Sequence, residues 1–198
     1  MPDGDLFKAL ASGEASVVTD QIETFTETGL LLKSGKTLPA DIIVTATGLR
    51  MQLLGEMEMV VDGRKIAPHE TTSYKGMMFS DVPNLASTFG YTNASWTLKA
   101  DLTAEYVCRL LRHMDRTGTR ICTPRLPQGE MEIEPWLDFS SGYVQRALAV
   151  LPRQGTKTPW KVHQNYALDL VALRYGKVDD GVMEFSKARA PVAAKAAA

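Results

Sequence analysis

The stretch ADIIVTATGL, at residues 40–49, gives the strongest indication of the fold. Its β-branched run, Ile42 to Val44, is typical of a strand that is buried on both faces. The run is followed by the small residues Ala46, Thr47 and Gly48, so no bulky side chain stands where the backbone leaves the sheet. Ligands of open α/β sheets bind beyond the carboxyl ends of such strands. Taken alone, however, such a run is more often a core strand that ends in a simple turn.

The composition is that of an ordinary globular protein and excludes several functional classes. The chain has 198 residues, of which 44% are hydrophobic and 23% charged, enough for one good-sized domain or two small ones. A net charge of −1 argues against nucleic acid or an anionic membrane surface as a partner. Neither a membrane-spanning run nor a signal peptide is evident. Cys108 and Cys122 form no metal-binding or disulfide pattern. We therefore expect a soluble, cytoplasmic protein without a metal site.

Turn signals divide the first third of the chain into a short helix and a meander. A helix is predicted from Asp5 to Ala11, and one or two strands within residues 15–26. Turns at residues 28–29 and 34–36 lie before and after a strand at 30–33. This order indicates an antiparallel meander that leads into the run at Ile42. Asp62-Gly63 favours a type I′ hairpin between residues 57–61 and 64–66.

The clearest helix of the sequence spans residues 96–116. Apolar residues recur there at four-residue spacing, and Gly118 provides a C-terminal stop. This stripe predicts a packing face, and Cys108 on the same helix is expected to be a small buried residue. A strand is expected at residues 85–89, and further helices at 143–150 and 165–175. Residues 188–198 lack a large apolar anchor and are expected to be disordered.

Several familiar catalytic motifs are absent or fail on their spacing. Residues 29–37, GLLLKSGKT, have one residue too many for a phosphate-binding loop and lead into a strand instead of a helix. No two glycines are separated by a single residue, so the dinucleotide fingerprint GxGxxG cannot occur. The three histidines lack metal-ligand spacing, and a hydrolase active site has no support.

An elbow at residues 90–98 has a geometry suited to an electron-rich ligand. A glycine and the polar run YTNAS lead into the long helix. The backbone N–H groups of Thr97 and Leu98 would lie at the positive end of the helix dipole. A reduced flavin develops negative charge along its N1–C2=O edge, which such a helix end would stabilise. The alternative is that Asn93, Ser95 or Thr97 only caps the helix.

Taken in order, the meander, ADIIVTATGL, YKGMM, VPNLASTFGYTNASWTLKADL and TPWKVHQNY resemble the C-terminal part of class B flavin-dependent monooxygenases. The similarity is to the Baeyer–Villiger-type branch, and it runs from about Asp3 to Pro191. The resemblance implies an enzyme that uses FAD and NADPH. Such enzymes insert one oxygen atom of O2 into ketones, or add it to sulfur or nitrogen, through a C4a-peroxyflavin.

The resemblance also implies which residues of this chain lie near the cofactors. Thr47 and Gly48 would mark the crossing between the two nucleotide-binding domains. The flavin ring would be bordered, mainly through backbone groups, by Gly90, Tyr91, Thr92, Asn93, Trp96, Thr97 and Leu98. The proline-rich segment 123–166 would help to wall the substrate side. No catalytic side chain is assigned.

The implied fold is α/β: part of a two-domain, Rossmann-like FAD/NAD(P)-binding flavoprotein, with an antiparallel β-meander and a helical C-terminal portion. Residues 1–48 would end the NADPH-binding domain and 49–118 would complete the FAD-binding domain. Residues 119–187 would form a substrate-side extension, and 188–198 a disordered tail.

The glycine fingerprints of these enzymes have no counterpart in the sequence, so the chain is expected to be their C-terminal portion. The apolar faces at Ile42, Ile43 and Val44 would then be exposed, ready for a separate N-terminal half or a second copy. Besides these, the implied partners are a small organic substrate and O2. The alternative is a non-catalytic binding or interaction module that cannot hold FAD alone.

Overall fold

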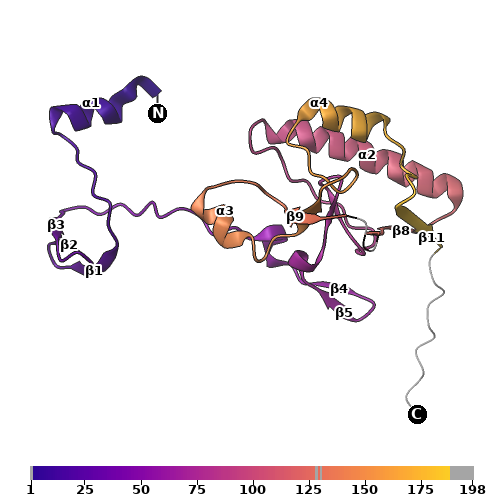
Figure 1. Ribbon diagram of the computed structural model, residues 1–198, viewed down its shortest axis with the longest axis horizontal. Helices are drawn as coiled ribbons and strands as arrows, with labels where there is room; N and C mark the ends of the chain where they lie inside the picture. Colours follow the sequence, from indigo (N-terminus) through magenta and orange to yellow (C-terminus); the bar gives the residue numbers. More distant parts are fainter. Residues whose placement is uncertain (1, 128, 130, 188–198) are drawn as a thin grey trace, which may run out of the picture. The chain divides into compact units, whose positions relative to one another are not determined.

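The computed structural model describes residues 2–127, 129 and 131–187, which form two compact units (Figure 1). The first unit comprises Met1–Gly48 and the second Leu49–Ala198. The predicted disordered tail, residues 188–198, lies outside the described residues.

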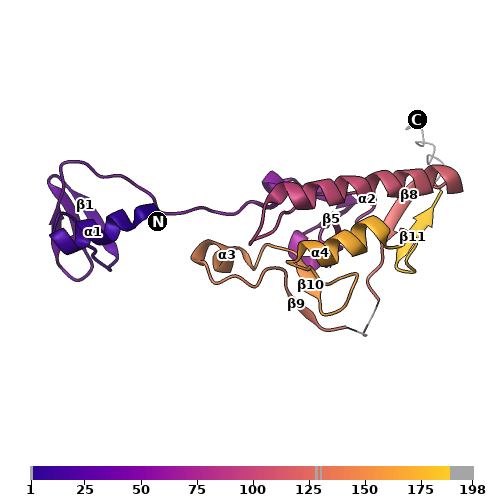
Figure 2. The same cartoon turned by 90° about the horizontal axis from the view of Figure 1, so that it is seen from above.

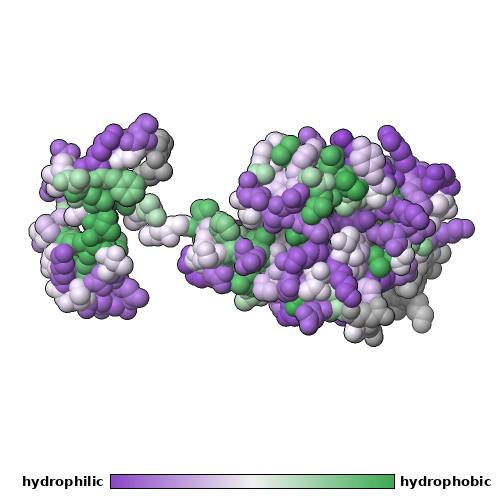
Figure 3. All heavy atoms as spheres, turned by 45° about the horizontal axis from the view of Figure 1, so that its top comes forward, coloured by the Kyte–Doolittle hydropathy of each residue, from purple (hydrophilic) through white to green (hydrophobic). Residues whose placement is uncertain are grey.

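The first unit contains one helix and the predicted antiparallel meander. Helix α1 spans Asp5–Ser12 and ends at Gly13, whose φ of 77° lies in the left-handed region that favours glycine. The three-stranded sheet has the order β1-β2-β3, with β1 at Ile22–Thr26, β2 at Gly29–Leu32 and β3 at Thr37–Pro39. Several hydrophobic residues of this unit, such as Phe7 and Phe25, are exposed. Hydrophobic surface is visible on this unit as green spheres (Figure 3).

The predicted buried strand at Ile42–Val44 is wrong for this structure. Residues 42–50 have no regular secondary structure, and the exposed fractions of Ile42, Ile43 and Val44 are 83%, 40% and 84%. Strand formation depends on hydrogen-bonding neighbours more than on residue propensity. Among the described residues, none pairs with this segment. The β-branched run is therefore present without the sheet that would bury it.

The second unit combines a long helix with short, two-stranded antiparallel sheets. These sheets pair β4 (Met59–Val61) with β5 (Arg64–Ile66), β6 (Ser73–Tyr74) with β7 (Met78–Phe79), β8 (Ile121–Pro124) with β11 (Met183–Ser186), and β9 (Ile133–Pro135) with β10 (Arg153–Gly155). The helices are α2 (Trp96–Thr117), α3 (Gly142–Ala147) and α4 (Tyr166–Asp169), and α4 continues as a π-helix over Leu170–Tyr175. The chain is thus of mixed α/β class.

The hairpin expected at Asp62-Gly63 is confirmed. Its two turn residues have φ angles of 49° and 80°, which are the positive values that a type I′ turn requires.

Helix α2 organises the second unit, as its periodicity predicts. Leu102, Tyr106, Leu110 and Met114 are buried, and α2 lies beside α4 in both views of the ribbon (Figures 1 and 2). The helix ends at Gly118, which has a φ of 67°. No described helix is long and apolar enough to span a lipid bilayer.

Two smaller expectations fail. Cys108 is exposed, because it lies on the side of α2 away from the buried stripe. Residues 85–89 form no strand. Instead of a ladder of strand hydrogen bonds, the segment makes an isolated one, in which the Ser87 N–H donates to the Met77 carbonyl at 2.7 Å. Asn84, with its φ of 56°, turns the backbone just before this segment.

The centre of the second unit contains a buried polar cluster. The Tyr74 hydroxyl donates to Asp180 Oδ2 at 2.6 Å and lies 3.0 Å from the Tyr106 hydroxyl. Lys75 pairs with the same carboxylate at 3.0 Å. Because each of these polar groups has a partner, they can be buried without a large desolvation penalty.

Candidate functional site

An apolar cavity of about 550 Å³ lies beside the elbow in the second unit. Its lining includes three of the predicted site residues, Tyr91, Thr92 and Trp96. The other lining residues come from 51–54, 87–89 and the segment between 136 and 144. The ring of Phe89 connects two walls, because its centroid lies 4.5 Å from that of Trp136 and 5.1 Å from that of Trp96. The cavity therefore offers flat aromatic surfaces to a ligand.

The elbow backbone is held in place by Gln164. The backbone N–H and the hydroxyl of Thr92 both donate to Gln164 Oε1, at 2.9 and 3.2 Å. The Asn93 side-chain amide donates to the Gln164 carbonyl at 3.2 Å. Gly90 is required beside these residues, since a Cβ there would lie 2.1 Å from the Trp96 ring. These contacts fix the path of the chain from Gly90 into α2.

The first turn of α2 has no side-chain cap. Ser95 occupies the N-cap position, but its hydroxyl contacts the Thr97 hydroxyl at 2.7 Å and no backbone N–H. Trp96, Thr97 and Leu98 are exposed. The structure therefore does not support the alternative that a side chain of the elbow only caps this helix. Backbone donors remain available at the positive end of the helix dipole.

A buried ion pair supports the elbow from within. Lys99 Nζ lies 2.8 Å from Asp169 Oδ2, and the two side chains are only 3% and 5% exposed. The Tyr91 hydroxyl donates to the same carboxylate oxygen at 2.7 Å. Burial, together with the hydrogen bond to Asp169, raises the pKa of Tyr91, so this phenol stays protonated at neutral pH. Tyr91 is thus anchored to both α2 and α4.

One polar atom in the cavity lining has no partner. Trp136 is 97% buried, and among the described residues its indole Nε1–H has no hydrogen-bond acceptor. An unpaired buried donor of this kind costs roughly 1–3 kcal/mol.

The predicted site residues fall into both units. Seven of them, at positions 90–93 and 96–98, lie together at the elbow of the second unit. Thr47 and Gly48 are the last residues of the first unit and are exposed. Groups of three or more His, Cys, Asp or Glu side chains arranged to hold a metal are absent from the part of the chain that the structure describes.

Sequence reasoning missed Gln164, Lys99 and Asp169, which all stabilise the elbow. Of these three, only Lys99 could have been suspected from the sequence, because a lysine next to the apolar stripe of a helix needs an acidic partner if it is buried. That partner lies 70 residues further along the chain.

Similarity searches relate nearly the whole chain to flavin-dependent enzymes. It is 52% identical over 192 residues to the FAD-containing monooxygenase EthA of Mycobacterium tuberculosis, which is 97% of this chain and 39% of that protein. It is 52% identical over 189 residues to the putative FAD-containing monooxygenase MymA of the same species. The probable FAD-binding monooxygenase AlmA of Acinetobacter baylyi is 53% identical over 188 residues, 94% of this chain.

The chain spans about two fifths of the length of these relatives. No protein-family profile matches it, and neither does any solved structure. The resemblance seen in the sequence is nevertheless confirmed: over almost its entire length this chain is homologous to a portion of proteins named as FAD-containing or FAD-binding monooxygenases.

Proposed function

We propose that the chain forms the flavin-bordering part of an FAD- and NADPH-dependent monooxygenase. The observation that carries the proposal is the aromatic cavity of about 550 Å³ that begins at the elbow. The relatives named as FAD-containing or FAD-binding monooxygenases support the same cofactor.

The residues around the elbow fit a flavin. Aromatic walls suit a flat tricyclic ring, and the uncapped N–H groups of Thr97 and Leu98 suit its electron-rich N1–C2=O edge. When bound, FAD would supply the two-electron chemistry that links NADPH to O2.

In this proposal the protein groups bind, orient and exclude water. Backbone N–H groups at the start of α2 would stabilise negative charge that develops at the flavin edge. The Lys99–Asp169 pair would hold Tyr91, and with it the elbow, in one position. In the net reaction NADPH provides two electrons, one oxygen atom of O2 enters the substrate, and the other leaves as water.

We assign the remaining segments by the same resemblance. Residues 1–48 would end the NADPH-binding domain, with Thr47 and Gly48 at the crossing. Residues 49–118 would complete a Rossmann-like FAD domain, and 119–187 would face the substrate. The oxygen acceptor would be a ketone, a sulfur or a nitrogen in a small organic molecule. A separate N-terminal half, or a second copy, would cover the exposed apolar residues of the first unit, in the cytoplasm.

The central test replaces Thr97 by proline and, as a matched control, by alanine. Proline removes the backbone N–H together with the hydroxyl and is tolerated in the first turn of a helix, whereas alanine removes the hydroxyl and γ-methyl but keeps the N–H, so the difference between the two variants reports on the N–H. We expect T97P to weaken FAD binding about tenfold, measured as Kd by flavin fluorescence quenching, and T97A to leave Kd within about twofold. Equal effects of the two substitutions would contradict the backbone contact.

The competing proposal is a non-catalytic binding or interaction module, and the absence of a GxGxxG fingerprint from the 198-residue sequence favours it. A visible spectrum of the purified chain with added FAD separates the two. Bound-flavin absorption together with NADPH oxidation supports the enzyme. A chain that remains colourless and inert supports the module.

A further inference from the structure

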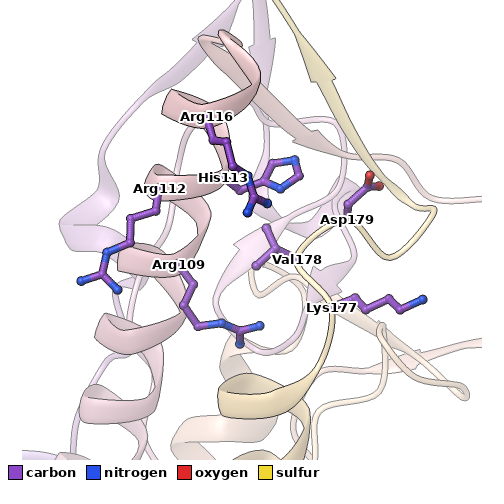
Figure 4. Close-up of a pocket in the computed structure, with 7 residues that line it drawn as sticks. All are labelled: Arg109, Arg112, His113, Arg116, Lys177, Val178 and Asp179. Carbon is purple, nitrogen blue, oxygen red and sulfur yellow. The ribbon is translucent and has the colours of Figure 1, made fainter.

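A second concave surface, which we call the basic groove, lies on the far half of α2. It has a volume of about 440 Å³ and is lined by seven residues, Arg109, Arg112, His113, Arg116, Lys177, Val178 and Asp179. Figure 4 shows the α2 side chains on one side and residues 177–179 on the other. Arg116 and His113 extend into the space between them, while Arg112 points to the other side of the helix in this view.

The groove concentrates positive charge in a chain that is nearly neutral. The lining residues include four cationic side chains and one carboxylate, a formal net charge of +3 with His113 neutral, whereas the whole chain carries −1. The α2 positions 109, 112, 113 and 116 are spaced by three and four residues, which places them along one face of the helix. Only Arg116 lies in the last turn, so complementarity to the helix dipole does not account for the whole cluster.

Most of this charge is not neutralised by other side chains. Within the described residues, Arg112, Arg116 and Lys177 have no carboxylate within 4.0 Å. Arg120 and Arg125, by contrast, each pair with an acid. Unpaired cations that converge on a concavity attract an anion more strongly than the same charges on a flat surface.

Part of the groove is preorganised. Arg109 donates to the carbonyls of Leu173, at 2.6 Å, and Gly176, which fixes its guanidinium and leaves other N–H groups free. The His113 ring packs against Phe185 with centroids 4.5 Å apart. A ligand would therefore meet two side chains that are already ordered, which lowers the entropy lost on binding.

We propose that the basic groove is a binding site for a compact phosphate-type oxyanion. Its arginines suit phosphate oxygens, and the Asp179 carboxylate can accept a hydrogen bond from a protonated P–OH. The groove is separate from the proposed flavin edge, because Arg109, its first residue on α2, lies 11 positions after Leu98, which corresponds to about 16 Å of helix. The proposal therefore does not depend on the flavin site.

The chain offers an internal probe, since His69, His113 and His163 are its three histidines. We would titrate inorganic phosphate into the 198-residue chain at pH 7 and constant ionic strength, and follow the imidazole proton signals by NMR. The expected result is a saturable shift of the His113 signal alone. Sulfate has no protonated oxygen at this pH that could donate to Asp179, so it should bind several-fold more weakly than phosphate.

Two substitutions test the location of the site. R116Q removes a cation that lies in the groove, and R120Q removes a paired cation just beyond it. We expect R116Q to weaken phosphate binding about tenfold and R120Q to change it less than twofold. Circular dichroism of both variants confirms that each is folded.

A non-saturating His113 signal, or equal weakening by R116Q and R120Q, would overturn the proposal, because both indicate only a diffuse surface field. A final experiment distinguishes free phosphate from the phosphate of a lipid headgroup. Sedimentation with phosphatidic acid vesicles, compared with phosphatidylcholine vesicles, shows whether a lipid headgroup also reaches the groove. Vesicle binding without any effect of free phosphate on His113 would exclude the compact site.

Discussion

At the scale of single residues, the buried pair of Lys99 and Asp169 is the most demanding feature of the site. Two charges that are almost fully removed from water are tolerated only because each has close partners. A positive charge in the first turn of α2, where the dipole is already positive, has no local reason to be there. Its reason is tertiary, because it joins α2, α4 and Tyr91 at one carboxylate.

Removing one member of this pair should therefore be costly. We expect K99M to lower the free energy of unfolding by about 3–5 kcal/mol, because it leaves Asp169 buried without its counter-ion. The double variant K99M/D169L should recover part of the loss, since no isolated charge remains. Urea denaturation measures all three proteins. A loss below about 1 kcal/mol in K99M would show that water reaches Asp169 and that the pair does not hold the elbow.

The buried tyrosines predict a loss of stability in alkali. Burial is the main cause that raises the pKa of Tyr74 and of Tyr106 above the usual value, and the Asp180 carboxylate raises both further. The unfolded chain loses these protons near pH 10 while the folded chain keeps them. The contribution of these protonated tyrosines to stability is therefore fully present below about pH 9. Above pH 10 the free energy of unfolding falls, by up to about 1.4 kcal/mol per pH unit for each tyrosine.

Urea denaturation at pH 8, 10 and 11 checks this sign. Y106F should reduce the alkaline loss, whereas Y175F should not, because Tyr175 is 71% exposed. An alkaline slope that is the same in both variants would assign the loss to other groups.

At the scale of elements, the sequence predicts what local interactions decide. Helix α2 follows from the spacing of its apolar residues and from Gly118, and the hairpin follows from Asp62-Gly63. Strands are expected at Ile42–Val44 and at residues 85–89, yet neither segment forms one, because a strand also needs a hydrogen-bonding partner that its own sequence does not supply. The same limit hides the site, because the elbow depends on Gln164 and Asp169, which lie 72 and 78 residues along the chain from the elbow residues they contact.

The meander offers a prediction at this scale through two of its glycines. A Cβ on Gly29 would lie 2.1 Å from the Leu38 carbonyl oxygen, so G29A should separate β2 from β3. Gly35 has a φ of 85° and open space around it, so G35A should cost only about 1 kcal/mol of backbone strain. Hydrogen exchange of residues 29–39 should be much faster in G29A than in G35A. Similar protection in both variants would mean that the sheet can shift to accept the methyl group.

At the scale of the whole molecule, the chain consists of two compact units whose boundary falls at residue 48. The segment that was expected to be the best-buried strand is instead exposed. Among the described residues, residues 41–48 make no backbone hydrogen bond to any other segment. Such a segment opens at almost no cost in free energy, and it is therefore the place where a protease should act first.

Limited proteolysis with thermolysin, which cleaves before exposed aliphatic residues, tests this division. We expect the first cut at Ile42, Ile43 or Val44, identified by N-terminal sequencing. Val60 is an internal control: it is also exposed, at 56%, but it is paired within β4 and β5 and should resist cleavage. The larger fragment should keep the thermal transition of the intact chain, because its core lies entirely beyond residue 48. An early cut at Val60 would show that the β4–β5 hairpin opens as readily as residues 41–48. A fragment that has lost the thermal transition would show that residues 1–48 contribute to the stability of the rest.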